Sequence, residues 1–406
     1  MAFEHIVIVG AGHSGGCAAS ALRAVDFPGC VTIVGAESHP PYERPPLSKE
    51  LLSGSVATEK TYLQPLAWYQ TSNIELRLNT EVLGIDRSTQ RLELAGGGTL
   101  PYDALLLTTG ARARKAPFID ERQQRVFYVR DIEDALALRE RLKPGTRLAV
   151  IGAGFIGLEI AATARKAGCA VTVVELAAQP LARVVPAQIG HRVAELHRRQ
   201  GIDLRLGYSV EAVEAANGRA TIRISGGDTI DADIVAVGIG AVPNVELGAA
   251  AGVRNDDGLV VDEFGRTSDP HIFAAGDVTR HFNPLLGRSI RLEAWQNAQN
   301  QAIAVAKVMA GGTTAFSEVP WLWTDQYDMN MQVAGAPAEY DRLVYRGEPA
   351  NGAFMAFQLV TNKVVGCISV NSPRDMRFAR MLIASGKAVD AEHLANPALK
   401  LQDMCR

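Results

Sequence analysis

Three glycines and a later glutamate form the pattern with the clearest chemical meaning in this sequence of 406 residues. The apolar run Arg147–Ile151 is typical of a short buried strand, and the glycine turn Gly152–Gly157 follows it directly. A helical pattern over 158–166 comes next, and a second apolar run, Ala170–Val174, stops at Glu175. Strand, glycine turn, helix, strand and terminal acid, in this order, are the unit that binds a dinucleotide.

Each residue of this unit has a physical task in holding a dinucleotide. Gly152 permits the tight turn, Gly154 lets the backbone approach a pyrophosphate, and Gly157 lets helix and strand pack closely. The helix N-terminus supplies free N–H groups and a positive dipole end to the phosphates. The Glu175 carboxylate would accept both adenosine ribose hydroxyls and repel a 2′-phosphate, and no Arg lies within the next seven residues. The pattern therefore predicts NADH rather than NADPH.

The same pattern opens the chain. His5–Val9 is typical of a strand, the turn Gly10–Gly15 follows, and a helix is expected over 18–25 before the next strand at Val31–Val34. Glu37 comes three residues after that strand. Two glycine turns, each with its strand, helix and acid, are poorly explained by accident. Two dinucleotides in one chain indicate electron transfer between them, usually from a nicotinamide to a flavin.

Size and composition restrict the other possibilities. A chain with 47% hydrophobic content and 38 glycines suits a large α/β core in two or three domains. A formal charge of −3 gives no reason to expect nucleic acid or an anionic membrane as a partner. No apolar stretch is long enough to span a bilayer, and the chain enters a strand too early for a signal peptide. The five scattered cysteines lack metal or disulfide spacing, so we expect reduced thiols, no metal site and a cytoplasmic protein.

A proline-rich segment, Pro40–Lys49, follows the first acid. Its prolines stiffen the chain in an extended form and disfavour helix before them. The segment carries two cations, Arg44 and Lys49, and a stiff backbone would hold their charges in place. Taken alone, such a run is also compatible with an ordinary loop.

Together these motifs resemble the flavoprotein ferredoxin reductases of bacterial oxygenase systems. The matching residues are Gly10–Gly15, Arg44–Lys49, Gly152–Glu159 and Ala275–Asp277, and the resemblance extends over nearly the whole chain. It implies a reductase that passes electrons from NADH through noncovalent FAD to a small ferredoxin with a 2Fe–2S cluster, of the Rieske or the plant and vertebrate type. The ferredoxin would supply an aromatic-ring dioxygenase, and a cytochrome monooxygenase system is the alternative.

The resemblance also implies the architecture. The expected fold class is α/β, with two Rossmann-like dinucleotide-binding domains, as in glutathione reductase, and a C-terminal α+β domain. The FAD-binding domain would be discontinuous, 1–112 and 246–315, because Ala275–Asp277 returns the chain to it. The NADH-binding domain would be 113–245, and the C-terminal interface domain would be 316–406.

Three residues would line the path of the electrons in such a protein. The resemblance places Lys49 near the flavin N5 atom and opposite Glu159, so that this charge pair lines the hydride path. A cation there would favour an anionic reduced flavin, and the pair would orient the nicotinamide. Trp323 would cover the flavin edge and relay electrons outward. An interdomain salt bridge would explain the pair equally well, and core packing is the default explanation for a strand tryptophan.

The resemblance assigns further flavin contacts. Val82 would lie at the adenine end of FAD, and Arg130 would contact the cofactor. Thr109 and Gly110 would close over it in a turn that reads Ala-Thr-Gly in the family, where this chain has Thr at the first position. Asp277 would accept from the ribityl chain, and a helix over 298–310 would place its N-terminus under the flavin pyrimidine ring.

The complete expected sets are as follows. The FAD contacts are Gly10, Gly12, Ser14, Gly15, Glu37, Arg44, Lys49, Val82, Thr109, Gly110, Arg130, Asp277, Glu293, Trp295 and Trp323. The NADH contacts are Gly152, Gly154, Phe155, Ile156, Gly157, Glu159, Glu175, Gly238 and Ile239. The last two would face the nicotinamide half, although a simple exit from a strand also explains the glycine.

Two other helices are expected, over Leu181–Gln200 and Arg374–Ser385. The second carries Arg374, Arg377 and Arg380, whose spacing of three residues puts them near one face. A basic face would suit an acidic ferredoxin, and an ordinary solvated helix face explains the spacing equally well.

Competing flavoenzyme classes make different demands on the sequence. Thiol-disulfide oxidoreductases need a close cysteine pair over the flavin, and the corresponding segment, Leu47–Ser53, contains no cysteine. An NADH peroxidase or oxidase of the one-cysteine type would need its cysteine near Ser48. Direct oxygen activation, as in a flavin monooxygenase, stays open because it depends on a cavity. A signalling flavoprotein similar to apoptosis factors would share Lys49, Phe155 and Glu159, but such proteins usually carry long insertions.

Overall fold

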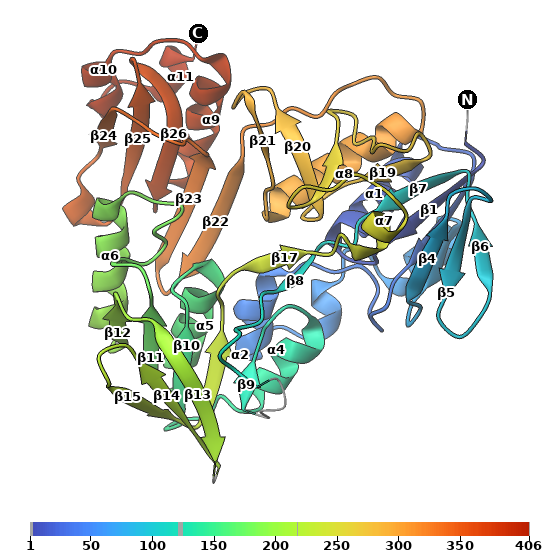
Figure 1. Cartoon of the computed structure of the whole chain (residues 1–406). Coiled ribbons are helices and arrows are strands. Elements are labelled where there is room, and N and C mark those ends of the chain that lie inside the picture. The colour runs from blue at the N-terminus through green and yellow to red at the C-terminus, as the bar shows by residue number, and fades with distance from the viewer. Residues whose placement is uncertain (1–2, 121–124, 217, 406) are drawn as a thin grey trace. The chain divides into compact units, whose positions relative to one another are not determined.

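The computed structural model describes residues 3–120, 125–216 and 218–405 (Figure 1). It divides into two compact units, which we describe separately. The first unit is Met1–Arg44, Glu59–Arg112 and Val242–Leu322, and the second is Pro45–Thr58, Ala113–Ala241 and Trp323–Arg406. The chain leaves the first unit in β8 (Ala111–Ala113) and returns in β17 (Ala241–Pro243). The three-domain division stays a prediction.

A five-stranded parallel sheet forms the centre of the first unit. Ile6 and Ile8 pack on one face of this sheet together with two helices, whereas Val7 and Val9 belong to the core on the other face. Successive side chains of a strand point to opposite faces, so a strand covered on both sides is apolar throughout. The strands in spatial order are β19 (Ile272–Ala274), β7 (Ala104–Leu107), β1 (His5–Val9), β2 (Cys30–Val34) and β3 (Ile74–Arg77), and the helices are α1 (His13–Ala24) and α8 (Trp295–Met309).

Two small sheets cover the other face of this central sheet. Leu92, Leu100, Leu259 and Val261 supply their share of the common core. Figure 1 shows the first of these sheets beside β1 and β7. The first sheet is β4 (Val82–Asp86), β5 (Arg91–Leu94) and β6 (Thr99–Pro101), and the second is β18 (Leu259–Val261), β20 (Thr279–Asn283) and β21 (Arg288–Ile290). The short helix α7 (Glu246–Ala250) packs against β4, whereas α3 (Leu66–Thr71) packs on the helical face beside β3.

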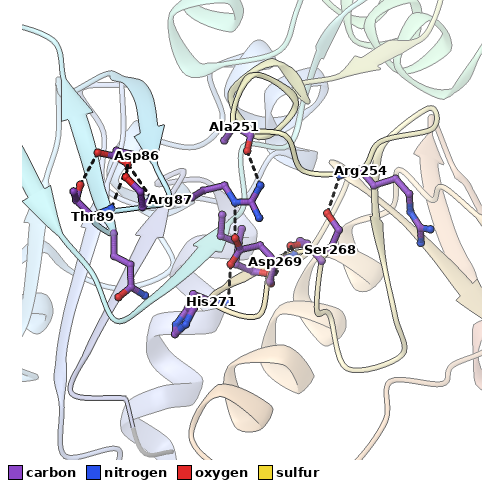
Figure 2. A network of polar contacts seen from close by, with 12 residues as sticks. Asp86, Arg87, Thr89, Ala251, Arg254, Ser268, Asp269 and His271 are labelled. Carbon is purple, nitrogen blue, oxygen red and sulfur yellow. Dashed lines mark hydrogen bonds and ion pairs between the residues drawn. The ribbon is translucent and has the colours of Figure 1, made fainter.

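A polar network joins the end of β4 to the turn before β19 (Figure 2). Arg87 donates from Nε to Asp269 Oδ2 at 2.5 Å and from Nη1 to the carbonyl of Ala251 at 3.2 Å. The other oxygen of Asp269 accepts from the backbone N–H of His271 at 2.8 Å. Asp269 is buried, so these donors replace the water that its carboxylate has lost. The network fixes the start of β19, the strand that leads to Asp277.

The second unit repeats this plan around another parallel sheet. Ile151, Val235 and Val237 face a core that is closed by an antiparallel sheet of three strands. Helix α5 (Phe155–Lys166) packs against the central strands. The parallel strands in spatial order are β12 (Asp203–Leu206), β11 (Ala170–Glu175), β10 (Arg147–Ile151), β16 (Ile234–Val237) and β9 (Val126–Phe127), and the antiparallel ones are β13 (Val210–Ala216), β14 (Arg219–Ile224) and β15 (Thr229–Ala232).

The C-terminal part of the chain is an antiparallel sheet with helices. Its strands in order are β22 (Trp321–Gln326), β23 (Met329–Gly335), β26 (Lys363–Val370), β25 (Phe354–Val360) and β24 (Arg342–Arg346). The α-helices α9 (Met376–Ser385), α10 (Ala391–Ala395) and α11 (Leu401–Met404) follow the sheet in the sequence. Within the described residues, no helix is both long and apolar enough to cross a membrane.

A single buried arginine holds the segment that joins α10 to α11. Arg346 donates to the backbone carbonyls of Leu394, Asn396 and Pro397 at 3.2, 2.6 and 3.4 Å, and also to the carbonyl of Leu399. Burial lowers the pKa of this guanidinium, although nearby Asp375 acts in the opposite direction. The planar fork of an arginine can serve several carbonyl oxygens at once, which a lysine cannot reproduce.

Two local expectations were wrong, and proline explains both. The helix expected over Leu181–Gln200 begins only with α6 (Ala187–Arg199), because Pro186 stands at its N-cap and disfavours helix before it. The segment around Pro45 was expected to be extended, but Pro45–Ser48 forms a 3₁₀ turn. The fixed φ of proline suits such a turn as well as an extended chain.

A buried histidine on β20 makes the first unit sensitive to acid. Burial lowers the pKa of His281 to about 4 from its ordinary 6.5, and within the described residues neither ring nitrogen has a hydrogen-bond partner. Below about pH 6.5 His281 is protonated in the unfolded chain, but in the folded chain it stays neutral down to about pH 4. The free energy of unfolding therefore decreases as the pH falls through this range.

We expect His281→Leu to reduce this loss. At pH 5 the histidine should cost the parent about 2 kcal/mol of unfolding free energy relative to pH 8, and the variant should lack that cost. Denaturant unfolding at both pH values, followed by circular dichroism, measures the difference. His191→Gln, at an exposed histidine on α6, is the matched control and should behave as the parent. An equal acid response in parent and His281→Leu would contradict the assignment.

Candidate functional site

The first glycine turn joins β1 to α1 and leaves one side open. Gly10 has φ of 115°, and a Cβ on Gly15 would lie 2.0 Å from the carbonyl oxygen of Gly10, so neither position admits a side chain. A Cβ on Gly12 would meet only the Arg44 guanidinium, 3.7 Å away. Gly12 is also the N-cap of α1 and makes no side-chain cap, so the N–H groups of the first helical turn point to this open side. This geometry fits a phosphate group.

A threonine pair closes the next turn. Thr108 Oγ1 lies 2.9 Å from the carbonyl oxygen of Gly10 and can donate to it, so the hydroxyl that departs from the family pattern holds the glycine turn. Thr109 Oγ1 donates to the Asn244 carbonyl, and the Asn244 side chain returns a hydrogen bond to the Thr109 carbonyl, each at 2.8 Å. Gly110 follows with φ of 64°. The expected turn at Thr109 and Gly110 is therefore a closed ring of hydrogen bonds.

The acid of the first unit, Glu37, is held by two side chains. Arg44 Nη2 donates to Oε1 at 3.0 Å and the Tyr42 hydroxyl donates to Oε2 at 2.5 Å. Burial alone would lower the pKa of Arg44, but Tyr42, Glu37 and Asp277 outweigh it, and the pKa is raised. Three predicted site residues, Glu37, Arg44 and Asp277, thus interact electrostatically. Each carboxylate oxygen keeps a second lone pair for a ribose hydroxyl.

The segment that ends at Asp277 is locked between α1 and α8. Ser14 Oγ donates to the Ala298 carbonyl at 3.0 Å, and a Cβ on Gly276 would lie 2.3 Å from Ser14 Oγ. The backbone N–H of Gly276, which has φ of 82°, donates to Gln301 Oε1 at 2.9 Å. The contacts bring Ser14, Asp277 and the start of α8 into one corner of the first unit.

An aromatic contact completes this corner. The ring centroids of Trp295, the first residue of α8, and His13, the first residue of α1, lie 4.9 Å apart. Burial, followed by the charge of Arg44, lowers the pKa of His13 to about 4, so this ring is neutral at physiological pH. Glu293 pairs with Arg291 just before α8. Val82 is the first residue of β4 and does not belong to this corner. It packs against the core between the central sheet and the two small sheets.

The second glycine turn has the same steric design as the first. A Cβ on Gly152, where φ is 103°, would lie 2.4 Å from the Gly238 carbonyl oxygen, and one on Gly157 would lie 2.1 Å from the Gly152 carbonyl oxygen. A Cβ on Gly154 would have no neighbour nearer than 4.0 Å. Gly154 is the N-cap of α5 and also lacks a side-chain cap. Both turns thus reserve an open side at the middle glycine and at the helix N-terminus.

The acid of the second unit is tied to the same turn. Glu175 Oε2 accepts from the backbone N–H of Ala153 at 2.7 Å, and Oε1 accepts from that of Ala177 at 2.8 Å. These bonds fix the carboxylate at the end of β11 beside the glycine turn. Ile156 is 44% exposed at the start of α5. Ile239 packs against the apolar core of the sheet.

The structure brings Lys49 and Glu159 together. Lys49 Nζ donates to Glu159 Oε2 at 2.8 Å, and the Ser48 hydroxyl donates to the same oxygen. Thr324 Oγ1 donates to Glu159 Oε1 at 2.6 Å. Glu159 is 3% exposed, so these donors must replace its hydration. The carboxylate therefore has both oxygens occupied and a fixed orientation.

The proline segment mounts this lysine on the second unit. The 3₁₀ turn Pro45–Ser48 and the following α2 (Glu50–Ser53) pack against α5, and α2 also packs against α4 (Ile132–Arg139). Thr163 Oγ1, on α5, donates to the carbonyl of Ser48 at 2.9 Å. The helix that carries Glu159 thus also holds the backbone next to Lys49.

The remaining predicted residues divide between the units. Arg130 precedes α4, and its backbone N–H donates to Asp134 in the capping box of that helix. Trp323 precedes Thr324 on β22, so the two side chains point to opposite faces of the strand. Lys49, Arg130, Trp323 and every expected NADH contact belong to the second unit, and the other expected FAD contacts belong to the first.

The basic helix face is only partly formed. Helix α9 begins at Met376, so Arg374 lies in the preceding 3₁₀ turn, Pro373–Asp375. Arg374 and Arg377 are exposed, whereas Arg380 is half-buried. A ferredoxin contact at this face stays a prediction.

Several residues of these sites carried no usable signal in the sequence. Asn244, Gln301 and Tyr42 each close a contact around a predicted residue. Asn244 lies 135 residues from Thr109, and only the fold brings such partners together. No group of three metal-ligating side chains gathers within the described residues.

Comparison with known proteins gives consistent matches over the chain. Residues 4–302 match the family described as pyridine nucleotide-disulphide oxidoreductase, and residues 321–405 match the reductase C-terminal family. The chain is 44% identical over 99% of its length, and 99% of the relative, to the ferredoxin–NAD(+) reductase component of an anthranilate 1,2-dioxygenase system from Burkholderia cepacia.

Two solved structures have the same fold. The covalent complex of putidaredoxin reductase with putidaredoxin matches with a TM-score of 0.96 and 36% identity over 100% of this chain and 98% of that one. The ferredoxin reductase for the CYP199A2 system of Rhodopseudomonas palustris matches with a TM-score of 0.96 and 37% identity over 99% and 100%. The predicted family resemblance and fold class are thereby confirmed, and a flavin and a nicotinamide nucleotide are the cofactors that the family implies.

The two glycines of the second turn allow a paired test. Gly157→Ala should cost about 2 kcal/mol or more of stability, because its methyl group would strike a backbone carbonyl. Gly154→Ala should leave stability unchanged, yet weaken nicotinamide nucleotide binding about tenfold or more, because its methyl group enters the open side. Thermal unfolding and nucleotide titration separate the effects. Parent-like nucleotide affinity in Gly154→Ala would place the phosphates elsewhere.

Proposed function

Because this chain belongs to the pyridine nucleotide-disulphide oxidoreductase family, we propose that it is an FAD-dependent NADH:ferredoxin reductase of a bacterial oxygenase system. The observation that carries the proposal is the pair of equivalent glycine turns, each open at its middle glycine. Two dinucleotides in one protein pass electrons between them. The segment Leu47–Ser53 offers no cysteine to receive those electrons, so they would leave for an external acceptor.

The finer cofactor assignment follows from the two acids. FAD, held without a covalent bond, would use the first turn, with Glu37 on its adenosine ribose and Asp277 toward the ribityl chain. NADH would use the second turn, because Glu175 is already fixed by two backbone N–H groups and would repel a 2′-phosphate. The expected FAD and NADH contacts keep these roles as proposals, as do the FAD domain, 1–112 and 246–315, the NADH domain, 113–245, and the interface domain, 316–406.

The protein would act mainly by positioning. A bound flavin takes a hydride from the nicotinamide and delivers its electrons singly to a one-electron acceptor. Lys49 would keep a positive charge near the flavin N5 position, since Glu159 holds its ammonium group at 2.8 Å. Glu159 would in turn present a fixed negative charge to the nicotinamide. Trp323 would cover the flavin edge on the exit route.

The proposed partner is a small 2Fe–2S ferredoxin in the cytoplasm. The relative from the anthranilate dioxygenase system favours an aromatic-ring dioxygenase as the final acceptor. The two structural matches, which act with putidaredoxin or in the CYP199A2 system, favour a cytochrome system as the alternative. A flavin oxidase or monooxygenase is the third candidate.

Stopped-flow absorbance of the purified flavoprotein tests the function. We expect NADH to bleach the flavin rapidly, oxygen to restore the colour slowly, and a 2Fe–2S ferredoxin to restore it at least about tenfold faster. Rapid recovery in oxygen without ferredoxin would instead identify an oxidase or monooxygenase. A stable charge-transfer band that ferredoxin does not discharge would favour a signalling flavoprotein.

Glu175→Arg tests the nucleotide choice. The loss of both ribose acceptors should weaken NADH binding about tenfold or more, and the new cation should improve use of NADPH. Competition between the two nucleotides in the flavin reduction assay measures the change. Glu195→Arg, at an exposed glutamate of α6, is the matched charge control. Unchanged NADH affinity would remove Glu175 from the ribose site.

A further inference from the structure

A buried polar chain extends from Glu159 away from Lys49 and through the second unit. Beyond Thr324, Gln326 Nε2 lies 3.1 Å from Thr324 Oγ1, and Gln326 Oε1 lies 2.7 Å from His197 Nε2. Thr324 and His197 are fully buried, and Gln326 is 1% exposed. The path thus joins α5, β22 and α6 without contact with solvent.

Hydrogen-bond donors must alternate with acceptors along such a chain, so it has only two self-consistent directions. In the first, His197 Nε2–H donates to the Gln326 carbonyl oxygen, the Gln326 amide donates to Thr324, and the Thr324 hydroxyl donates to Glu159. In the second, every bond is reversed, and Thr324 then offers Glu159 a lone pair instead of a proton. At 2.6 Å from Thr324, Glu159 would have to be protonated to make that contact.

The ion pair decides between the two directions. A protonated Glu159 would give up its attraction to Lys49 Nζ at 2.8 Å, whereas the first direction adds a donor to a carboxylate already served by Lys49 and Ser48. The first direction requires His197 to carry its proton on Nε2. His197 Nδ1 is then a bare acceptor, in agreement with its having no hydrogen-bond partner within the described residues.

We propose that Thr324, Gln326 and His197 are positioning residues that hold the Glu159 carboxylate in a fixed orientation for hydride transfer. The His197 N–H donor requires the Gln326 carbonyl oxygen on its side, so the Gln326 amide N–H faces Thr324. The Thr324 hydroxyl, which accepts from that N–H, is then free to donate its proton to the Glu159 carboxylate. The inference rests on the proposed function only in so far as Glu159 and Lys49 line the hydride path. The direction of the chain itself is independent of that role.

Charged and titratable groups lie at both ends of the chain of hydrogen bonds. Lys49 faces Glu159 directly. Tyr327 packs edge-on against His197 with ring centroids 5.3 Å apart, and Lys166 lies over the Tyr327 ring. Burial raises the pKa of Tyr327, although Arg165 acts in the opposite direction, so this phenol stays neutral over the range of the test. Glu159 is therefore the carboxylate that the chain orients.

The test begins with the unaltered flavoprotein. Nitrogen-15 NMR of protein labelled at histidine should show His197 in the form protonated at Nε2, with the signal assigned by its loss in His197→Phe. A ring protonated at Nδ1 alone would reverse the chain and overturn the proposal. This measurement needs no variant to be stable beyond the one that assigns the signal.

Infrared spectroscopy then measures Glu159 itself. The antisymmetric carboxylate band that Glu159→Gln removes should shift in frequency in Thr324→Val relative to the parent, because a hydrogen-bond donor to one of its oxygens is lost. Thr324→Ser, which keeps the hydroxyl, should restore the parent value. His197→Phe should shift the band in the same direction by a smaller amount, and Gln326→Leu provides a second variant for the same link. No shift in either of these two would limit the chain to Thr324 and overturn the proposal.

Kinetics separates this inference from the proposed function. The limiting rate of flavin reduction should fall in the variants whose carboxylate band shifts, while the NADH dissociation constant stays the same. If the band shifts but the rate does not change, the hydrogen-bond chain stands and the role of Glu159 in hydride transfer fails. If Glu159→Gln is reduced as fast as the parent at every pH, that role fails in the same way.

Discussion

Burial of the Glu159 carboxylate is the constraint on which the rest of the second unit depends. An ion that loses its water must recover equivalent contacts within the protein, or it will be protonated instead. Lys49, Ser48 and Thr324 supply those contacts from segments that lie far from Glu159 in the sequence. The 3₁₀ turn, α5 and β22 must therefore all be in place before the charge is tolerated. The charged Glu159 site can therefore form only when these three segments of the second unit are folded together.

The two glycine turns have the same steric requirements at their three glycines. In each, a third glycine lies so close to the carbonyl of the first that a methyl group would be about 2 Å from the oxygen. The middle glycine is the only one of the three with space around it. The packing between helix and strand thus requires glycine at two positions, and a phosphate group on the open side would require it at the third. Two different causes would then explain why the same three glycines occur in both turns.

Local patterns sufficed to predict much of this fold. Each strand, the turn after it and its acid lie within one short segment, 5–37 or 147–175, and the structure forms the strands His5–Val9 and Arg147–Ile151 as expected. The helix expected from Leu181 was misjudged because its pattern ran across Pro186. Gln326 and His197 could not be paired in advance, since 129 residues separate them and His197 belongs to no motif. The resemblance to a family supplied the pairing of Lys49 with Glu159, which periodicity alone could not.

The bonds of Arg346 have a consequence for sequence variation. All its contacts with the segment 394–399 go to backbone carbonyls, which every amino acid possesses. The backbone path of segment 394–399 is therefore set by Arg346 on β24 and does not depend on the side chains of the segment. Related chains can accumulate changes between α10 and α11 without altering the course of the backbone, provided that the arginine is retained. Divergence in this segment is then a poor measure of divergence in structure.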